Sequence, residues 1–276
     1  MAPKEKKFRS WQQRARHQDV VLISHPRCGL TWVRFLFHEI RKRVHPEELL
    51  KDSRQERNPL VRQDHDLMGL GTCKNRSWFQ EPHLFLKYKG AHGKKWEKYR
   101  VIFLTRDPRD ALVSNWYRIC QRDRADVRYA GREYTLDDFV RDPAWGIEIF
   151  CLWLNWWAEY RNEVHAFLWT SYETLWQVPE IALRDMLRFI GISCERSVIR
   201  EAIEASSFEK MKKAEQDRGT LFKDLRPGYK ERPETMIVRK GGCGGWKEEM
   251  SEETQAFCLR HLKTLVEPFA CYYRSQ

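Results

Sequence analysis

The chain has 276 residues, of which 42% are hydrophobic and 32% charged, and this length allows one large domain or two small ones. No apolar stretch is long enough to span a bilayer, and the charged N-terminal segment lacks the apolar centre of a signal peptide, so we expect a cytoplasmic protein. The 50 Lys and Arg residues outnumber the 39 Asp and Glu residues, and the formal charge of +11 favours an anionic partner such as a nucleotide, a nucleic acid or a membrane surface.

Eight cysteines are scattered through the chain without a CxxC pair. This spacing predicts reduced thiols rather than disulfides or a zinc site. We therefore expect no metal at the functional site.

The first half of the chain predicts two buried strands, each followed by a helix. After a loose basic arm at residues 1–18, residues 20–24 form the short apolar run of a parallel strand, and apolar residues then recur at helical spacing through residue 43. Residues 51–83 are polar and irregular, which indicates loops and short helices over the site. Residues 100–105 form the second apolar run, and a helix begins near Pro108.

The second half continues the alternation of helices and strands. We predict a Trp-rich helix at 146–165, a strand and its exit at 167–175, a helix at 179–192 and a last helix at 251–269. Together the elements predict an α/β fold with a central parallel sheet flanked by helices, in a single domain that we place at residues 19–276. Such sheets bind ligands at the C-terminal ends of their strands.

The segment HPRCGLTW, residues 25–32, joins the first predicted strand to its helix. Its backbone N–H groups meet the positive end of the helix dipole, Gly29 lets the backbone curl closely, and Arg27 and Thr31 add a cation and a hydroxyl. These features suit the binding of one anionic group. The alternative is an ordinary strand–turn–helix with a surface arginine, which would show the same sequence pattern. The pattern GxxxxGK[ST] is absent, which argues against a nucleoside triphosphate with bound metal.

Two later segments have similar features. In TRDPRDALVSN, residues 105–115, Arg106 and Ser114 can face one phosphate, although a salt-bridged Arg–Asp turn is the alternative. In VRKGGCGGW, residues 238–246, four glycines follow Arg239 and Lys240 and predict a loop whose backbone lies on an anion, with a flexible hairpin as the alternative.

Taken in this order, the three segments resemble motifs of the cytosolic-type sulfotransferases, which use 3'-phosphoadenosine 5'-phosphosulfate (PAPS). HPRCGLTW is similar to the family's 5'-phosphosulfate loop YPKSGTTW, RDPRDALVSNW to its 3'-phosphate segment RNPKDxxVSxY, and RKGGCGGWK to its late segment RKGxxGDWK. SYETL at 171–175 and SSFEKMK at 206–212 are weaker matches. The resemblance implies a P-loop-like sulfotransferase fold and transfer of a sulfuryl group to a hydroxyl or amine of a small organic acceptor, with release of adenosine 3',5'-bisphosphate. It implies no specific nucleic-acid or membrane partner, and it leaves the oligomeric state open.

The resemblance also implies which residues hold the donor. The residues expected at the 5'-phosphosulfate are Arg27, Cys28, Gly29, Leu30, Thr31 and Trp32, with Trp32 stacking near the adenine. Those expected at the 3'-phosphate are Arg106, Ser114, Arg239, Lys240 and Gly241. Tyr172, Ser206 and Phe208 are expected to border the adenine.

For catalysis, the resemblance places Arg27 where the family has a lysine, and Ser114 joins it among the expected catalytic residues. An arginine keeps the charge but cannot act as an acid. The family's histidine base corresponds to Lys89, or to Tyr88 if the register shifts by one. We favour His92 over Lys89, and His83 is a third candidate.

The sequence departs from the family at two further places. Gly245 replaces the aspartate of RKGxxGDW, which predicts a looser loop. Residues 247–256 differ from the family's dimerisation segment, so we do not infer the dimer.

Residues 51–83, 120–160 and 220–235 are expected to form the acceptor pocket, and their aromatic and acidic residues suggest a small cationic or polar acceptor. Three other interpretations stay open: a kinase-like transferase, a basic nucleotide- or nucleic-acid-binding protein, and a sulfotransferase fold without activity.

Overall fold

The computed structural model describes residues 20–44, 62–64, 97–122, 134–143, 145–217 and 236–274. Its centre is a sheet of four parallel strands in the order β2-β1-β3-β4. The strands are β1 (Val20–Ser24), β2 (Arg62–Asp64), β3 (Arg100–Thr105) and β4 (Ala166–Ser171). In register, Leu22 of β1 pairs with Ile102 of β3, and Ile102 pairs with Leu168 of β4. The predicted parallel sheet is therefore confirmed.

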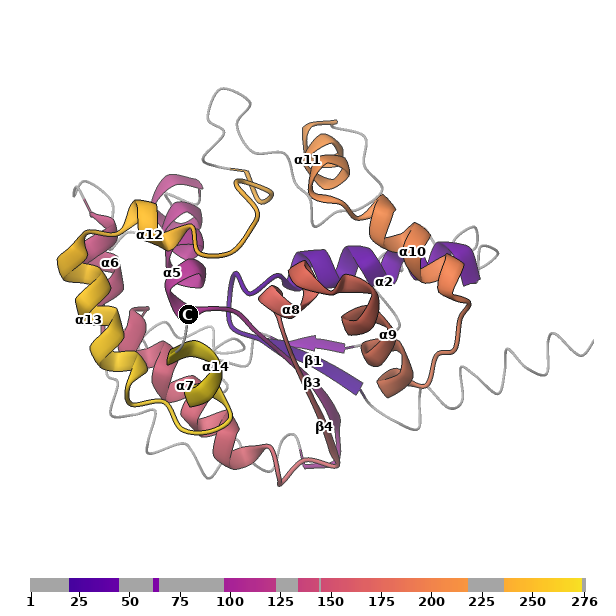
Figure 1. Cartoon of the computed structure of the whole chain (residues 1–276), viewed down its shortest axis with the longest axis horizontal. Coiled ribbons are helices and arrows are strands. Elements are labelled where there is room, and N and C mark those ends of the chain that lie inside the picture. Colours follow the sequence, from indigo (N-terminus) through magenta and orange to yellow (C-terminus); the bar gives the residue numbers. More distant parts are fainter. Residues whose placement is uncertain are drawn as a thin grey trace, which may run out of the picture.

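Two groups of helices cover the sheet (Figure 1). The first group consists of α2 (Leu30–Val44), α8 (Tyr172–Gln177), α9 (Pro179–Ile190), α10 (Arg196–Ala205) and α11 (Phe208–Gln216). The second consists of α5 (Pro108–Trp116), the π-helix η2 (Tyr117–Arg122), α6 (Leu136–Arg141), α7 (Ile147–Tyr160), α12 (Trp246–Glu249), α13 (Glu252–Leu262) and α14 (Phe269–Arg274). Because helices lie on both faces, every residue of β1 is buried.

The ends of several elements differ from the sequence prediction. The predicted helix at 251–269 is two helices, because α13 stops at Leu262 and Pro268, which has no N–H to donate, precedes α14. The strand and its exit predicted at 167–175 divide at Ser171, where β4 ends and the hydroxyl caps α8 by accepting from the N–H of Thr174. The predicted helix at 146–165 ends at Tyr160.

Strand β2 was missed altogether. It lies within residues 51–83, for which we expected loops and short helices. Its three residues, RQD, are polar and too few to give an apolar run or an alternation.

The core is built around Phe103 in the middle of β3. Its ring lies 4.8 Å from that of Trp153 and 5.0 Å from that of Trp157, both on α7, measured between centroids. Phe167 and Phe269 complete the contact at 5.6 and 5.7 Å. Two tryptophans of α7 therefore join this helix to the sheet.

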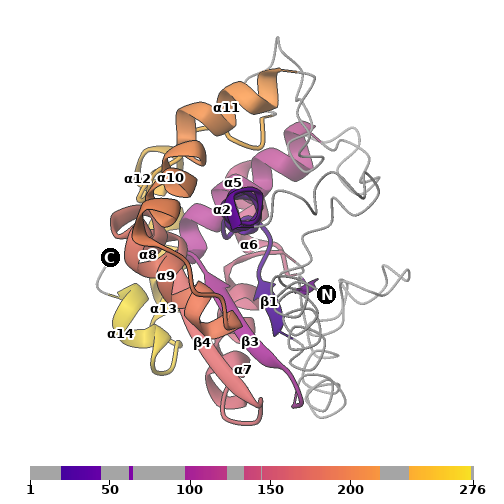
Figure 2. The ribbon, with the colours of Figure 1, turned by 90° about the vertical axis from the view of Figure 1, so that its right-hand side faces the viewer.

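The C-terminal ends of β1 and β3 lie next to each other, and α2 and α5 start beyond them (Figure 2). Both helices therefore direct the positive ends of their dipoles to one edge of the sheet. This edge is where a ligand is expected in such a sheet.

Within the described residues, none of the cysteines forms a disulfide, and no group of His, Cys, Asp or Glu side chains could hold a metal ion. None of the helices described is both long and apolar enough to cross a membrane.

We predict that Phe103→Ala lowers the free energy of unfolding by about 3–5 kcal/mol, because a fully buried ring is removed from contact with three elements. Chemical denaturation measures this change. The control is Ile181→Ala on α9, where the side chain is 48% exposed and we expect a change below about 0.5 kcal/mol. Equal effects of the two substitutions would show that the core does not centre on Phe103.

Candidate functional site

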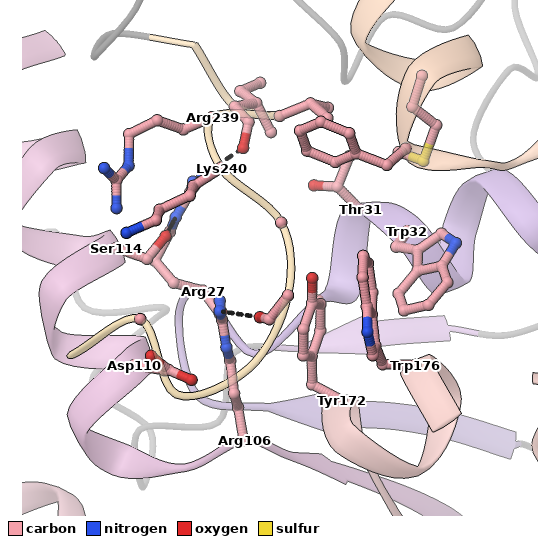
Figure 3. Close-up of a pocket in the computed structure, with 18 of the residues that line it drawn as sticks. Arg27, Thr31, Trp32, Arg106, Asp110, Ser114, Tyr172, Trp176, Arg239 and Lys240 are labelled. Carbon is pink, nitrogen blue, oxygen red and sulfur yellow. Dashed lines mark hydrogen bonds between the residues drawn. The ribbon is translucent and has the colours of Figure 1, made fainter. Parts of the chain in front are cut away.

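A pocket lies at the sheet edge where β1 and β3 end, and it is closed on another side by the loop at residues 239–245, called here the glycine loop. Figure 3 shows arginine and lysine side chains on one side of this pocket and aromatic rings on the other. Every predicted binding residue except Cys28 lines it: Arg27, Gly29, Leu30, Thr31, Trp32, Arg106, Ser114, Tyr172, Ser206, Phe208, Arg239, Lys240 and Gly241. Segments more than 200 residues apart in the sequence therefore meet around one cavity.

Arg27 adopts an uncommon backbone conformation in the loop after β1. Its φ is +70°, in the left-handed region that costs a non-glycine residue roughly 1–2 kcal/mol. Its side chain donates to Ser114 Oγ at 2.9 Å and to the carbonyl of Ile237 at 3.1 Å. Contacts with two distant segments thus fix Arg27, and they bring it together with Ser114, another of the predicted catalytic residues.

Gly29 follows in the same loop with φ +94°. A Cβ atom at this position would lie 2.7 Å from Cδ2 of Tyr172, closer than real contacts allow. Glycine is therefore required both for the turn and for the approach of Tyr172.

Arg106, at the end of β3, contacts both predicted phosphate loops. Its guanidinium donates to the carbonyl of Arg27 at 3.3 Å and to that of Gly242 at 3.2 Å. It also lies 4.2 Å from the ring centroid of Tyr172, a cation–π contact. The turn also contains an Arg–Asp salt bridge, which was the alternative interpretation. Its arginine is Arg109 and not Arg106, and it pairs with Asp107 at 2.6 Å.

The glycine loop contains no helix or strand, as predicted, and Gly241, Gly242 and Gly244 all have positive φ. Asp110, on the first turn of α5, accepts from the N–H groups of Gly244 at 2.7 Å and Trp246 at 3.0 Å.

The two predicted cations of this loop both pair with carboxylates of α12. Arg239 contacts Glu249 at 2.9 Å and Lys240 contacts Glu248 at 2.6 Å. Arg239 also lies 3.8 Å from the ring centroid of Tyr117. In this structure these pairs set the direction of both side chains.

Aromatic side chains form the opposite wall. Trp32 donates through Nε1 to the carbonyl of Ser206 at 3.1 Å, and its ring meets those of Tyr172 and Trp176 edge-on. Tyr172 and Trp176 lie nearly parallel, with 18° between their planes and 6.3 Å between centroids. Both residues line the cavity, as does Phe208.

Burial shifts the pKa values of the carboxyl groups beneath the pocket. It raises the pKa of Asp110, while Arg106 and the two loop N–H groups oppose the rise. It also raises the pKa of Glu173, which accepts from the N–H of Asp107 at 2.8 Å and so joins the ends of β3 and β4.

Cys28 is the one predicted binding residue that does not line the pocket, and its part in binding stays a prediction. Its side chain is fully buried, and burial raises the pKa of the thiol far above its usual range. Its N–H donates to the carbonyl of His25 at 3.3 Å and so stays within the turn. The family motif is a run of consecutive residues, whereas the backbone curl turns this one side chain inward.

Sequence reasoning missed several lining residues, among them Arg34, Asp110, Arg118, Trp176, Met211 and Glu249. Helical spacing could have found Trp176, because it lies four residues beyond the predicted residue Tyr172 on the same helix, α8. The candidate bases His92, Lys89, Tyr88 and His83 lie outside the described residues, as do the predicted acceptor segments 220–235 and most of 51–83.

Comparisons with known proteins give the family of the chain and its fold. The sequence model of the family described as "Sulfotransferase domain" matches residues 17–267. Cytosolic sulfotransferase 6 of Arabidopsis thaliana is 24% identical over 260 residues, covering 86% of this chain and 75% of that protein. Sulfotransferase 1C2 of Homo sapiens is 21% identical over 255 residues, covering 88% of this chain and 82% of that protein.

Solved structures show the same fold. Mouse sulfotransferase SULT7A1 complexed with PAP superposes with a TM-score of 0.57 at 16% identity, covering 99% of this chain and 94% of that one. Retinol dehydratase in a complex with retinol and PAP gives a TM-score of 0.59 at 15% identity, covering 94% and 86%. The predicted family and fold are confirmed.

We predict that Gly241→Ala and Gly245→Ala differ in stability. A Cβ at Gly241 would meet Cδ2 of Phe208 at 2.7 Å in a residue with φ +69°, so this substitution should cost more than about 1 kcal/mol. Gly245 has φ −62°, and its nearest neighbours would lie 3.8 Å from the new atom, so the free energy of unfolding should stay within about 0.5 kcal/mol of wild type. Thermal and chemical unfolding of the two variants measure the difference, and an equal cost would contradict the loop geometry.

Proposed function

The chain belongs to the sulfotransferase family and is a PAPS-dependent enzyme, and we propose how its pocket holds the donor and what kind of acceptor it serves. The observation that supports the proposal is the meeting of two anion-binding loops and an aromatic wall around one cavity. We place the catalytic domain at residues 19–276, in line with the family match over most of that range.

In this proposal the 5' end of the donor lies in the loop after β1. The N–H groups of residues 29–32 are at the start of α2, where the helix dipole favours negative charge. Arg27 supplies the cation, held by Ser114 and Ile237 so that its guanidinium needs little reorganisation.

The 3'-phosphate lies between β3 and the glycine loop. Arg106 approaches it from the turn before α5 and Ser114 approaches it from α5 itself. Lys240 and Gly241 approach it from the opposite side. The two sides of this phosphate site are already connected, because the guanidinium of Arg106 donates to the carbonyl of Gly242.

The nucleoside lies against the aromatic wall. Stacking on such side chains is worth about 1–3 kcal/mol per base. Ser206, which is 1% exposed, has a hydroxyl that makes no hydrogen bond within the described structure, and Arg106 Nε is likewise unpaired there. Both atoms keep donor capacity at the site, so the residues present suit a polar, doubly phosphorylated nucleotide.

PAPS supplies a sulfuryl group that passes in line to the acceptor, and negative charge then collects on the oxygen shared with the 5'-phosphate. Arg27 faces this position as a fixed positive charge and does not transfer a proton. Ser114 holds the arginine through its Nε. A base from His92, Lys89, Tyr88 or His83 stays a prediction.

We propose a small organic molecule with a hydroxyl or amine as the acceptor, and a cytoplasmic location. Relatives named cytosolic sulfotransferases, and a flavonol 3-sulfotransferase of Flaveria bidentis that is 24% identical over 256 residues, support this. The competing nucleic-acid-binding interpretation would require strongly salt-dependent binding of oligonucleotides.

An acceptor screen tests the proposed function. The protein is incubated with PAPS and a panel of hydroxyl- and amine-bearing small molecules, and mass spectrometry detects addition of one sulfuryl group. Turnover of a panel member is the expected result. Absence of PAPS binding by calorimetry, together with tight oligonucleotide binding, would overturn the proposal.

We predict that Arg27→Ala lowers turnover by about 100-fold or more, because it removes a preorganised charge from the reacting centre. Arg27→Lys should retain part of the activity, since the charge remains without the fork geometry. The control is Arg200→Ala on α10, whose side chain is 60% exposed and pairs with Glu180 outside the pocket. Steady-state kinetics measure all three variants, and an active Arg27→Ala would remove this arginine from the mechanism.

A further inference from the structure

The first turn of α5 is attached to the glycine loop through one carboxylate. Asp110 is 5% exposed, and its two oxygens accept from N–H groups on either side of Gly245, those of Gly244 and Trp246. We propose that Asp110 is a positioning residue that fixes the glycine loop for the 3'-phosphate and so sets the preference for nucleotides that carry this group. The proposal rests on the donor-binding function proposed above.

The loop needs such an attachment because its sequence does not order it. Glycine loses more conformational freedom on folding than any other residue, and three glycines here adopt positive φ. Within the described residues, the backbone-to-backbone hydrogen bonds of this loop are confined to its end, where Lys247 and Glu248 donate to the carbonyls of Gly244 and Gly245. Side chains from the segment at residues 106–110 also hold its backbone, because Arg106 donates to the carbonyl of Gly242 and Asp110 accepts from the N–H of Gly244.

These contacts align the loop with Arg106. Arg106 holds the carbonyl of Gly242, and Asp110, four residues further along the same segment, holds the N–H of Gly244. Arg109, between them, lies 3.8 Å from the ring centroid of Trp246 and fixes the end of the loop. The segment at residues 106–110, which carries Arg106, therefore also sets the position of the loop backbone at Lys240 and Gly241.

A purely structural role for Asp110 makes a different prediction. If Asp110 were a general anchor, its loss would lower stability and would weaken the binding of all nucleotides alike, because the 5' loop and the aromatic wall share the same sheet edge. A positioning role affects only ligands that reach the glycine loop. The contrast between adenosine 3',5'-bisphosphate and adenosine 5'-monophosphate isolates this difference.

Calorimetry with these two nucleotides tests the proposal on wild type, Asp110→Ala, Asp110→Asn and the control Asp137→Ala. Asp137 is an acidic residue on the first turn of α6 that accepts from Ser251 and does not line the pocket. We expect Asp110→Ala to weaken the binding of the bisphosphate by about 10-fold or more, since two hydrogen bonds to a charged group are lost. The affinity for the monophosphate should change by less than about 2-fold.

Asp110→Asn should give an intermediate loss, because the amide keeps the size of the side chain and one acceptor oxygen. If the alanine variant unfolds, this variant carries the test alone. Hydrogen exchange of the Gly244 and Trp246 amides gives a second readout, and both amides should exchange faster in either variant.

Equal weakening of both nucleotides, or an unchanged preference for the bisphosphate, would overturn the role of Asp110. Failure of the proposed function looks different, because wild type itself would then show no preference for the bisphosphate.

Discussion

The site depends on one partly buried cation, Arg106, held at the end of a strand. Its guanidinium binds backbone carbonyls and the face of Tyr172, and Asp110 is the acid on the adjoining helical turn. Carbonyl oxygens satisfy N–H groups but do not neutralise a charge, so a partly desolvated arginine of this kind is best stabilised by an anion. Arg106 contacts both the loop after β1 and the glycine loop. The same side chain therefore also holds these two loops close to each other.

The parallel sheet makes this arrangement possible. The C-terminal ends of β1 and β3 are adjacent, so the turns that follow them, and the N-termini of α2 and α5, lie side by side. The aromatic contacts of Phe103 join β3 to α7 and keep its end in place. The left-handed backbone of Arg27 is a cost that the hydrogen bonds of its side chain to Ser114 and Ile237 help to offset. The strain in that loop is therefore offset by contacts that a nucleotide site also needs.

Much of this could be predicted from the sequence, because apolar runs and glycine-bearing turns are local signals. The strands at 20–24 and 100–105 and the helices that follow them were predicted in this way, and the resemblance to the sulfotransferases indicated many of the residues of the pocket. Asp110 was missed because its role lies in hydrogen bonds to residues 134 or more positions away, which no local pattern records. The burial of the Cys28 thiol was not foreseen for a similar reason, since only the three-dimensional turn shows that it enters the core. Strand β2 is defined by its pairing with β1 and not by its composition.

The central claim is that one nucleotide spans both loops. A crystal structure of the protein with adenosine 3',5'-bisphosphate measures this most directly. The account predicts one phosphate at about 3 Å from the backbone N–H groups of residues 29–32, and the other at a similar distance from Arg106, Ser114 and Gly241. A nucleotide bound elsewhere, or one that leaves Arg106 facing only backbone carbonyls, would contradict it.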